Sequence, residues 1–238
     1  MDYILTVDYH THTVHSHGLG TIRDNVLAAR KRGLKEIGIT DHGPNLEHGI
    51  SREQVPKIRQ MVDGINEEFD DITGHLGVEA NIINIGNGLD IAPEEFVNYD
   101  YVIAGYHYGL ANGYCAENWK DMYKGFNSKS LMIKNTEMML NAIYSNDLKI
   151  LTHPGDKARV DILELAKACA ETDTLMEINM EHDKLNTVQL GICAKTDAKF
   201  VISSDAHVPE RVGSYEGGLL RAVNAGIDLE RIVNIRRK

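Results

Sequence analysis

The chain alternates between short apolar runs rich in β-branched residues and longer segments in which apolar residues recur at helical spacing. Strands that alternate with helices in this way form parallel sheets joined by right-handed crossovers. Short apolar runs bounded by turn residues are typical of strands buried in such a sheet. The pattern predicts seven strands, at residues 4–9, 36–40, 76–80, 101–106, 149–152, 175–179 and 199–204.

Two of the intervening segments show where their helices begin or how they pack. Thr21 precedes an apolar stripe at helical spacing, Asp24 follows it as in a capping box, and Gly33 is a stop signal. The apolar residues from Val55 to Phe69 repeat every three or four positions, as on a helix that lies on a sheet. Further helices are expected at residues 131–144, 162–170, 188–194 and 216–225.

No internal repeat or Pro/Ser-rich linker divides the sequence, so residues 1–238 are expected to form one domain. The longest stretch without a clear strand or helix pattern is 108–129, which contains Trp119 and several glycines. A connection of this length inside a compact domain is usually functional or mobile. We expect it to act as a lid that closes over bound substrate.

Composition narrows the class of protein. The chain has 42% hydrophobic residues and a formal net charge of −10, which excludes a disordered chain and makes nucleic acid and membranes poor partners. No apolar run reaches the roughly 18 residues that cross a bilayer, and the N-terminus lacks a basic signal-peptide region. The three cysteines form no C-x-x-C pair. A cytoplasmic location is therefore expected.

The 11 histidines gather in short polar segments at the ends of the predicted strands. His10 and His12 lie two residues apart in an extended segment, so their side chains can reach one ion from the same side. Six of the seven strands place a histidine or an acid at or beyond their carboxyl ends, and in a closed parallel barrel these ends meet at one mouth. The others at strand ends are His42, Glu79, His107, His153, Asp205 and His207.

A single histidine near a strand end is more often structural than a ligand, so the joint arrangement carries the prediction. The alternative interpretation holds for the histidines outside this pattern, which we expect in exposed loops or behind the ligands. His15 and His17 both remain open, since either could fold back over the site. The histidines assigned to the structural interpretation are His15, His48, His75 and His182.

Six motifs, H-T-H-T-V-H-S-H, T-D-H-G-P, G-V-E-A-N, A-G-Y-H, T-H-P-G and S-D-A-H, follow one another between residues 8 and 207. In this order they resemble the PHP (polymerase and histidinol phosphatase) superfamily, and most closely its stand-alone three-metal phosphatases. The resemblance implies an α/β fold, a distorted TIM-like (β/α)7 barrel with three divalent ions at its carboxyl-terminal mouth.

The resemblance also implies a ligand set. The first ion would be held by His10, His12, Glu79 and Asp205. The second would share Glu79 as a bridge and add His107 and His153. The third would be held by His17, His42 and His207, with His17 favoured over His15 although the interval is one residue shorter than in the family pattern. Residues next to these ligands could orient the imidazoles: Asp8, Asp41 and Asn179.

Three dications against two ligand carboxylates would make the mouth positive in an acidic protein, as a phosphate dianion requires. We expect a metal-dependent hydrolase of phosphate monoesters in which a hydroxide bridging two ions attacks phosphorus. Glu79 and Asp205 would then be catalytic, with Arg159 and Arg211, or Lys157, as cations for the phosphoryl oxygens. An imidazole-rich, thiolate-free set suits zinc best, and manganese or iron also fits.

Alternatives remain in substrate and in reaction class. Histidinol phosphate is the second candidate substrate, because the segment P-G-D-K-A-R after His153 differs from that of dedicated histidinol phosphatases. Related metal barrels also hydrolyse phosphodiesters or amides. A metal-binding PHP module without activity is the non-enzymatic alternative. In all enzymatic cases the partner is a small substrate, and the sequence does not predict an oligomeric state.

Overall fold

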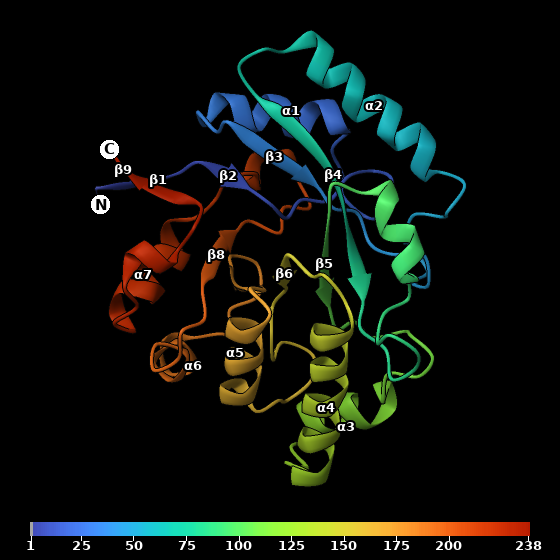
Figure 1. Cartoon of the computed structure of the whole chain (residues 1–238), viewed down its shortest axis with the longest axis vertical. Helices are drawn as coiled ribbons and strands as arrows, with labels where there is room; N and C mark the ends of the chain where they lie inside the picture. The colour runs from blue at the N-terminus through green and yellow to red at the C-terminus, as the bar shows by residue number, and fades with distance from the viewer. Residues whose placement is uncertain (1) are drawn as a thin grey trace.

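The computed structural model describes residues 2–238. Seven parallel strands lie side by side in chain order, and an isolated parallel bridge between Thr11 and Ala206 joins the ends of the first and the last. The sheet therefore forms a nearly closed barrel (Figure 1), which confirms the expected distorted TIM-like fold. The strands are β2 (Val7–Asp8), β3 (Glu36–Ile39), β4 (Thr73–Asn81), β5 (Tyr101–Gly105), β6 (Ile150–Leu151), β7 (Leu175–Asn179) and β8 (Phe200–Ser203).

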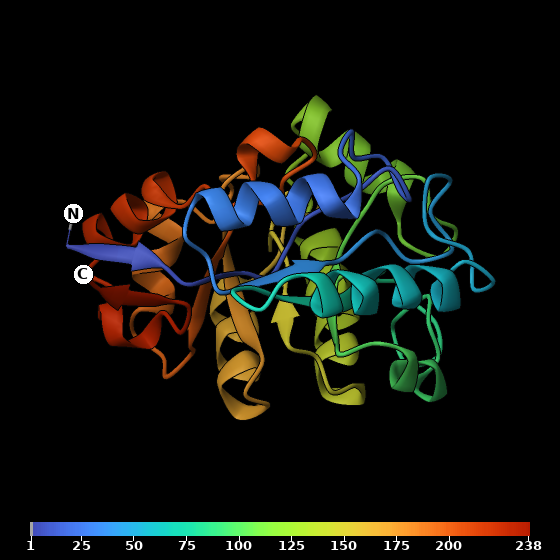
Figure 2. The same ribbon diagram turned by 90° about the horizontal axis from the view of Figure 1, so that it is seen from above.

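The helices lie outside the sheet (Figure 2), and the apolar stripes of all but α3 pack into the core. The capping box at Thr21 is present, since its hydroxyl accepts from the Asp24 amide and the Asp24 carboxylate accepts from the Thr21 amide. The five expected helices downstream of this one are also confirmed within one or two residues at most ends. The helices are α1 (Ile22–Lys31), α2 (Val55–Glu68), α3 (Cys115–Lys124), α4 (Lys129–Ser145), α5 (Ile162–Glu171), α6 (Thr187–Cys193) and α7 (Glu216–Asn224), with short 3-10 turns η1 (Pro93–Asn98), η2 (Pro209–Arg211) and η3 (Leu229–Arg231).

The first predicted strand, residues 4–9, is wrong as a single element. Its beginning is β1 (Tyr3–Leu5), which pairs antiparallel with β9 (Ile235–Arg237) outside the barrel and brings the two termini together (Figure 1). Asn234 lies at the break: its carbonyl accepts from the Thr6 amide (2.9 Å), and its buried side chain donates to the carbonyls of Val7 (2.9 Å) and Ile202 (2.7 Å). A side-chain amide thus bridges β2 and β8 where direct strand pairing is missing.

The predicted loop at 108–129 is also wrong, because it contains helix α3. Its buried residues are Asn118 and Asp121, so the apolar periodicity that reveals other helices is absent here. Asn118 and Asn135 of α4 exchange two hydrogen bonds, of 3.0 and 2.7 Å, that hold the two helices together. Trp119 is 47% exposed on α3. Only the start of the segment, Tyr108 and Gly109, lines the pocket described below.

The barrel interior is polar at the carboxyl ends of the strands and apolar deeper inside. Glu79 is paired in register with Ile103, Ile103 with Ile150, and Ile150 with Leu175, so these side chains share the inner face. The three apolar residues, Ile103, Ile150 and Leu175, form a separate buried cluster with Val201 beneath the carboxyl ends of the strands. This apolar plug is the floor of the polar mouth. Within residues 2–238, the helices include none that is both long and apolar enough to span a membrane.

Candidate metal centre

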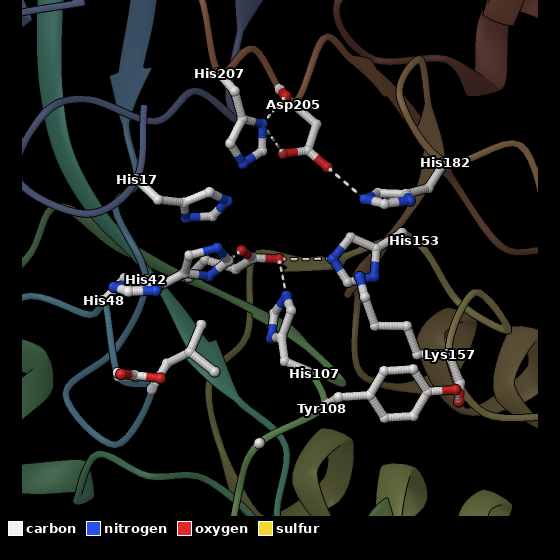
Figure 3. Close-up of a pocket in the computed structure, with 14 residues that line it drawn as sticks. His17, His42, His48, His107, Tyr108, His153, Lys157, His182, Asp205 and His207 are labelled. Carbon is white, nitrogen blue, oxygen red and sulfur yellow. Dashed lines mark hydrogen bonds and ion pairs between the residues drawn. The ribbon is translucent and has the colours of Figure 1, made fainter. Parts of the chain in front are cut away.

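A pocket of about 330 Å³ opens at the carboxyl ends of the barrel strands. Most of the predicted ligands line it, and Figure 3 shows their side chains directed toward one another. His10 and His12 lie buried beneath, at 0% and 1% exposure. The predicted ligands that line the pocket itself are His17, His42, Glu79, His107, His153, Asp205 and His207.

Glu79, fully buried on β4, lies at the centre of this group. Its Oε1 is 2.9 Å from His153 Nε2 and 3.5 Å from His107 Nε2. Its Oε2 is 2.8 Å from His42 Nδ1 and 3.4 Å from His10 Nε2. The two carboxylate oxygens therefore face different imidazoles, as expected of a carboxylate that bridges two ions.

A second convergence lies where the first and last barrel strands meet. His10 Nε2 and His12 Nε2 are 3.0 Å apart, and Asp205 Oδ1 is 3.4 Å and 3.1 Å from them, respectively. Ring nitrogens that close need a proton or a cation between them. Among residues 2–238, three groups have ligand atoms within 4.8 Å of one another: His10, His12, Asp205; His42, Glu79, His107; and His12, His42, His207.

Several of these buried atoms find no hydrogen-bond partner of acceptable geometry within residues 2–238, although His42 Nδ1 and Glu79 Oε2 lie 2.8 Å apart. Buried polar atoms are normally paired, so a group of unpaired ones calls for an explanation. Carboxylate oxygens and imidazole nitrogens are the donors that Zn²⁺ and related divalent ions accept. The residues present therefore fit divalent ions. The unpaired atoms are His12 Nδ1, His42 Nδ1, His107 Nδ1, Glu79 Oε2 and Asp205 Oδ1.

Electrostatics keeps Glu79, His12 and His17 in the forms that bind metals, whereas the carboxylates around His10 outweigh its burial and raise its pKa well above the usual range. Burial alone would raise the pKa of Glu79, but the imidazoles of His107 and His10 outweigh it and hold that pKa well below its usual range. Burial, with His42 nearby, lowers the pKa of His12 to about 3. Burial and the neighbouring His207 lower the pKa of His17 to about 4. Neutral imidazoles and an ionised carboxylate offer free lone pairs to a cation.

The structure brings His17 to the mouth and leaves His15 outside. The His17 ring centroid lies 4.8 Å from that of His42 and 4.2 Å from that of His207. His15 lines a separate apolar groove, together with Ile22 and Met61 from α1 and α2. Within the histidine-rich loop, the two residues thus point to different sides.

The sequence profile of the PHP domain matches residues 8–181, nearly three quarters of the chain. The chain belongs to the PHP family. It is 31% identical to a "probable phosphatase" of Proteus mirabilis (strain HI4320), covering 96% of this chain and 89% of the relative. It is 30% identical to a "probable phosphatase" of Shigella flexneri serotype 5b (strain 8401), with the same coverage of each.

Among solved structures, the PHP chain resembles histidinol phosphate phosphatase from Lactococcus lactis subsp. lactis Il1403, complexed with zinc, L-histidinol and phosphate. The TM-score is 0.64 at 17% identity, over 94% of this chain and 95% of the other. At that identity the likeness concerns the fold. The family match, the relatives and the donor set of the pocket together confirm the expectation of a metal-dependent phosphoesterase.

The backbone of the PHP barrel is strained where two of the predicted ligands begin their loops. His153 has a φ of 29° and Asp205 a φ of 52°, a region that costs a non-glycine residue about 1–3 kcal/mol. Gly105 leaves the room that this arrangement needs. A Cβ there would lie 2.2 Å from Thr152 Oγ1, 2.6 Å from His153 Cε1 and 2.8 Å from Glu79 Oε1.

Two of the residues expected to orient imidazoles hold loop backbone instead. Asp41 accepts hydrogen bonds from the Thr13 amide (2.7 Å) and the Ser16 hydroxyl (2.5 Å) in the histidine-rich loop. Asp8 accepts from the amides of Ser204 (3.1 Å) and Gly213 (2.7 Å). These contacts shape the two segments that carry predicted ligands on either side of the barrel closure.

Sequence reasoning missed three residues of the PHP site, one of which is His48, a further histidine that lines the pocket (Figure 3). Glu177 on β7 is fully buried and accepts from His10 Nδ1 at 2.7 Å. An acidic residue inside the otherwise apolar run L-M-E-I was the available signal. His182 lines the pocket, with Nδ1 3.2 Å from Asp156 Oδ2 and Nε2 3.6 Å from Asp205 Oδ2. Only topology places it there, because it follows β7 in a loop.

The two arginines predicted to grip phosphate lie elsewhere. Arg159 Nε donates to Asp121 Oδ2 at 2.6 Å and lines a neighbouring cavity, because helix α3, which the sequence did not predict, supplies that carboxylate. Arg211 pairs with Glu181 at 3.1 Å on the surface. Lys157 does line the metal pocket, with Nζ 3.1 Å from an Asp156 oxygen.

Proposed function

We propose that this PHP protein is a phosphomonoesterase for small phosphorylated substrates that works with three divalent ions at the barrel mouth. The observation that carries the proposal is the position of Glu79, whose two oxygens face different imidazoles inside one pocket. A carboxylate so placed can serve two ions about 3.5–4 Å apart, the spacing of two-metal hydrolases.

The proposed ligands follow the sets that the family resemblance implies, and the second and third sets each differ in one member from a group that converges in the pocket. His10, His12, Glu79 and Asp205 would hold the first ion. Glu79, His107 and His153 would hold the second. His17, His42 and His207 would hold the third, and the close ring contacts among these three support that set. Nitrogen-rich donors without thiolate suit zinc, with manganese or iron as the alternatives.

When bound, such ions would supply a hydrolytic nucleophile at neutral pH and offset the charge of a phosphate dianion. The chain adds a cation of its own, Lys157, at the side of the pocket near His153. Asp156 holds Lys157 Nζ at 3.1 Å and His182 Nδ1 at 3.2 Å, so both side chains keep to the rim near His153. Lys157 therefore takes the phosphate-gripping role expected of Arg159 and Arg211.

The size of the pocket limits the substrate. About 330 Å³ must accommodate the ions and the phosphoryl group, which leaves room for a small leaving group beside Leu46 and Tyr108. A monoester presents one more charged oxygen than a diester to a positive mouth and carries no second bulky substituent. Histidinol phosphate remains the alternative substrate.

The deciding experiment is kcat/KM of the metal-reconstituted protein for three substrates under one metal condition: an aryl phosphate, the matching diaryl phosphodiester, and histidinol phosphate. We expect the aryl monoester to exceed the diester by well over 10-fold. A preference for the diester would replace the proposal with a phosphodiesterase, and dominance of histidinol phosphate would establish the alternative substrate. No turnover of any of the three, with ions bound, would refute the enzyme.

Lys157→Ala and Arg211→Ala form a matched pair of variants for the phosphate contact. Lys157→Ala should raise the inhibition constant for inorganic phosphate by about 10-fold, since one charge-assisted hydrogen bond is lost. Arg211→Ala should leave it unchanged because Arg211 lies outside the pocket lining. The reverse order would return the role to the arginine.

A further inference from the structure

Strand β7 supplies none of the proposed ligands, yet it carries a fully buried carboxylate beneath them. Glu177 accepts three hydrogen bonds: from His10 Nδ1 at 2.7 Å, from the His153 amide at 2.8 Å and from Asn179 Nδ2 at 2.8 Å. The first engages Oε1 and the other two engage Oε2. Both oxygens are therefore occupied by donors from three different parts of the site.

We propose that Glu177 is a positioning residue that fixes the tautomer of His10 and couples two ion sites through one carboxylate. A carboxylate only accepts, so the proton of a neutral His10 ring resides on Nδ1. The lone pair then lies on Nε2, which faces His12 Nε2 at 3.0 Å and Asp205 Oδ1 at 3.4 Å. The inference rests on the proposed function, in which His10 holds the first ion.

The second oxygen of Glu177 acts on a ligand of the second ion. His153 has a φ of 29°, and its amide would be a buried, unpaired donor without Glu177 Oε2. Asn179 shares that oxygen and also donates to Asp205 Oδ2 at 3.0 Å. One carboxylate and one amide on β7 thus contact His10, His153 and Asp205.

A glutamine at this position cannot reproduce the three contacts. If its single oxygen faced His10, its NH₂ group would meet the donors of His153 and Asn179. If the oxygen faced those two donors, the NH₂ group would donate to His10 Nδ1 and drive the ring proton onto Nε2. That nitrogen would then have no lone pair for a metal ion. Each orientation of the amide therefore damages one of the two ion sites.

The test compares Glu177→Gln with Glu36→Gln. Glu36 makes the same kind of contact with His75, at 2.8 Å, but away from the pocket. Zinc stoichiometry and affinity are measured by competition with a chromophoric chelator. We expect Glu177→Gln to lower the affinity for at least one zinc ion by about 10-fold to 100-fold, the usual loss when a residue that hydrogen-bonds to a ligand is changed. Glu36→Gln should match the unmodified protein.

A measurement on the unmodified chain keeps the inference testable if Glu177→Gln fails to fold. Long-range ¹⁵N–¹H correlation spectra of the zinc-loaded protein, labelled at histidine, report which nitrogen of each ring carries the proton. We expect His10 to be protonated at Nδ1. Protonation at Nε2, or equal zinc affinity in Glu177→Gln and Glu36→Gln, would overturn the inference and leave the proposed function standing. Failure of the unmodified protein to bind zinc, manganese or iron would overturn both.

Discussion

Two carboxylate–imidazole pairs of this barrel have nearly the same length and opposite surroundings. His10 and Glu177 are 2.7 Å apart with both side chains fully buried, whereas His75 and Glu36 are 2.8 Å apart with 27% and 41% exposure. The exposed pair joins the beginning of β3 to that of β4. The buried pair lies at the carboxyl ends, where further nitrogens and oxygens converge. Position along the strand, more than contact distance, decides what such a pair can do.

The physical reason is solvent. An exposed ion pair gains little because water already stabilises both partners, and its usual worth is about 0–1 kcal/mol. The buried pair has no such alternative, so removing one partner leaves the other unsatisfied. Changes at the buried mouth should therefore have larger effects than changes at the exposed pair.

Removal of the ions should have the largest effect. Dialysis against a strong chelator should abolish hydrolysis and lower the midpoint of thermal unfolding, because ligands that bind the folded state at 1,000 times their Kd contribute about 4 kcal/mol. Elemental analysis before and after dialysis, with re-addition of zinc as control, checks this. Full turnover in protein with only trace metal would contradict a metal-binding role for the buried pair of His10 and Glu177 and leave it no functional difference from the exposed pair.

Glu79→Gln should come next. It halves the negative charge of the Glu79–Asp205 ligand pair and weakens contacts to two proposed ions. Turnover should therefore fall by more than about 100-fold, the upper end of the loss that is usual for a residue behind a ligand. Steady-state kinetics and metal content measure this, with His75→Ala as the control outside the pocket. Equal behaviour of the two variants would show that β4 does not supply the bridge.

The two neighbouring histidines of the N-terminal loop should behave differently. His17→Ala should lose about one ion per chain, since its ring lies against His42 and His207. His15→Ala should keep the full complement, because that ring lies in the groove between α1 and α2. Metal content at saturating zinc distinguishes them. Loss of an ion only in His15→Ala would reverse the assignment.

A methyl group at position 105 should disturb the packing of the barrel mouth while leaving its ionisable residues unchanged. Gly105→Ala forces a Cβ into Thr152, His153 and Glu79, and overpacking of this kind costs about 1–3 kcal/mol. Gly64→Ala in α2 meets nothing within 4 Å and should stabilise the helix by about 0.5–1 kcal/mol. Chemical denaturation of both variants gives the two signs. A neutral Gly105→Ala would mean that the mouth can relax.

The exposed pair should give the smallest effect. A double-mutant cycle on Glu36→Gln and His75→Ala should yield a coupling free energy of about 0–1 kcal/mol that shrinks as salt is added. Denaturation at low and high ionic strength measures it. A coupling of several kcal/mol, insensitive to salt, would contradict the contrast with the buried pair.

Local patterns were enough for much of this protein. The capping box at Thr21, the apolar stripe of α2 and the strand runs depend on neighbours within a few residues, so the sequence displays them directly. The histidines and acids at strand ends were visible for the same reason. Parallel topology then required those ends to meet, which is why the mouth could be predicted before its geometry was known.

Other features depended on segments far apart in the chain. Helix α3 buries polar side chains that pair with α4, and Arg159 donates to a carboxylate of α3. Asn234, near the C-terminus, bridges the first and last barrel strands. No periodicity encodes such pairings, because each partner is polar and satisfied only after folding. His10 and Glu177 are separated by 167 residues. The sequence by itself determined which strand ends carry the predicted ligands, and only the tertiary structure decided which buried carboxylate contacts them, since a buried polar group takes whichever partner the fold brings within reach.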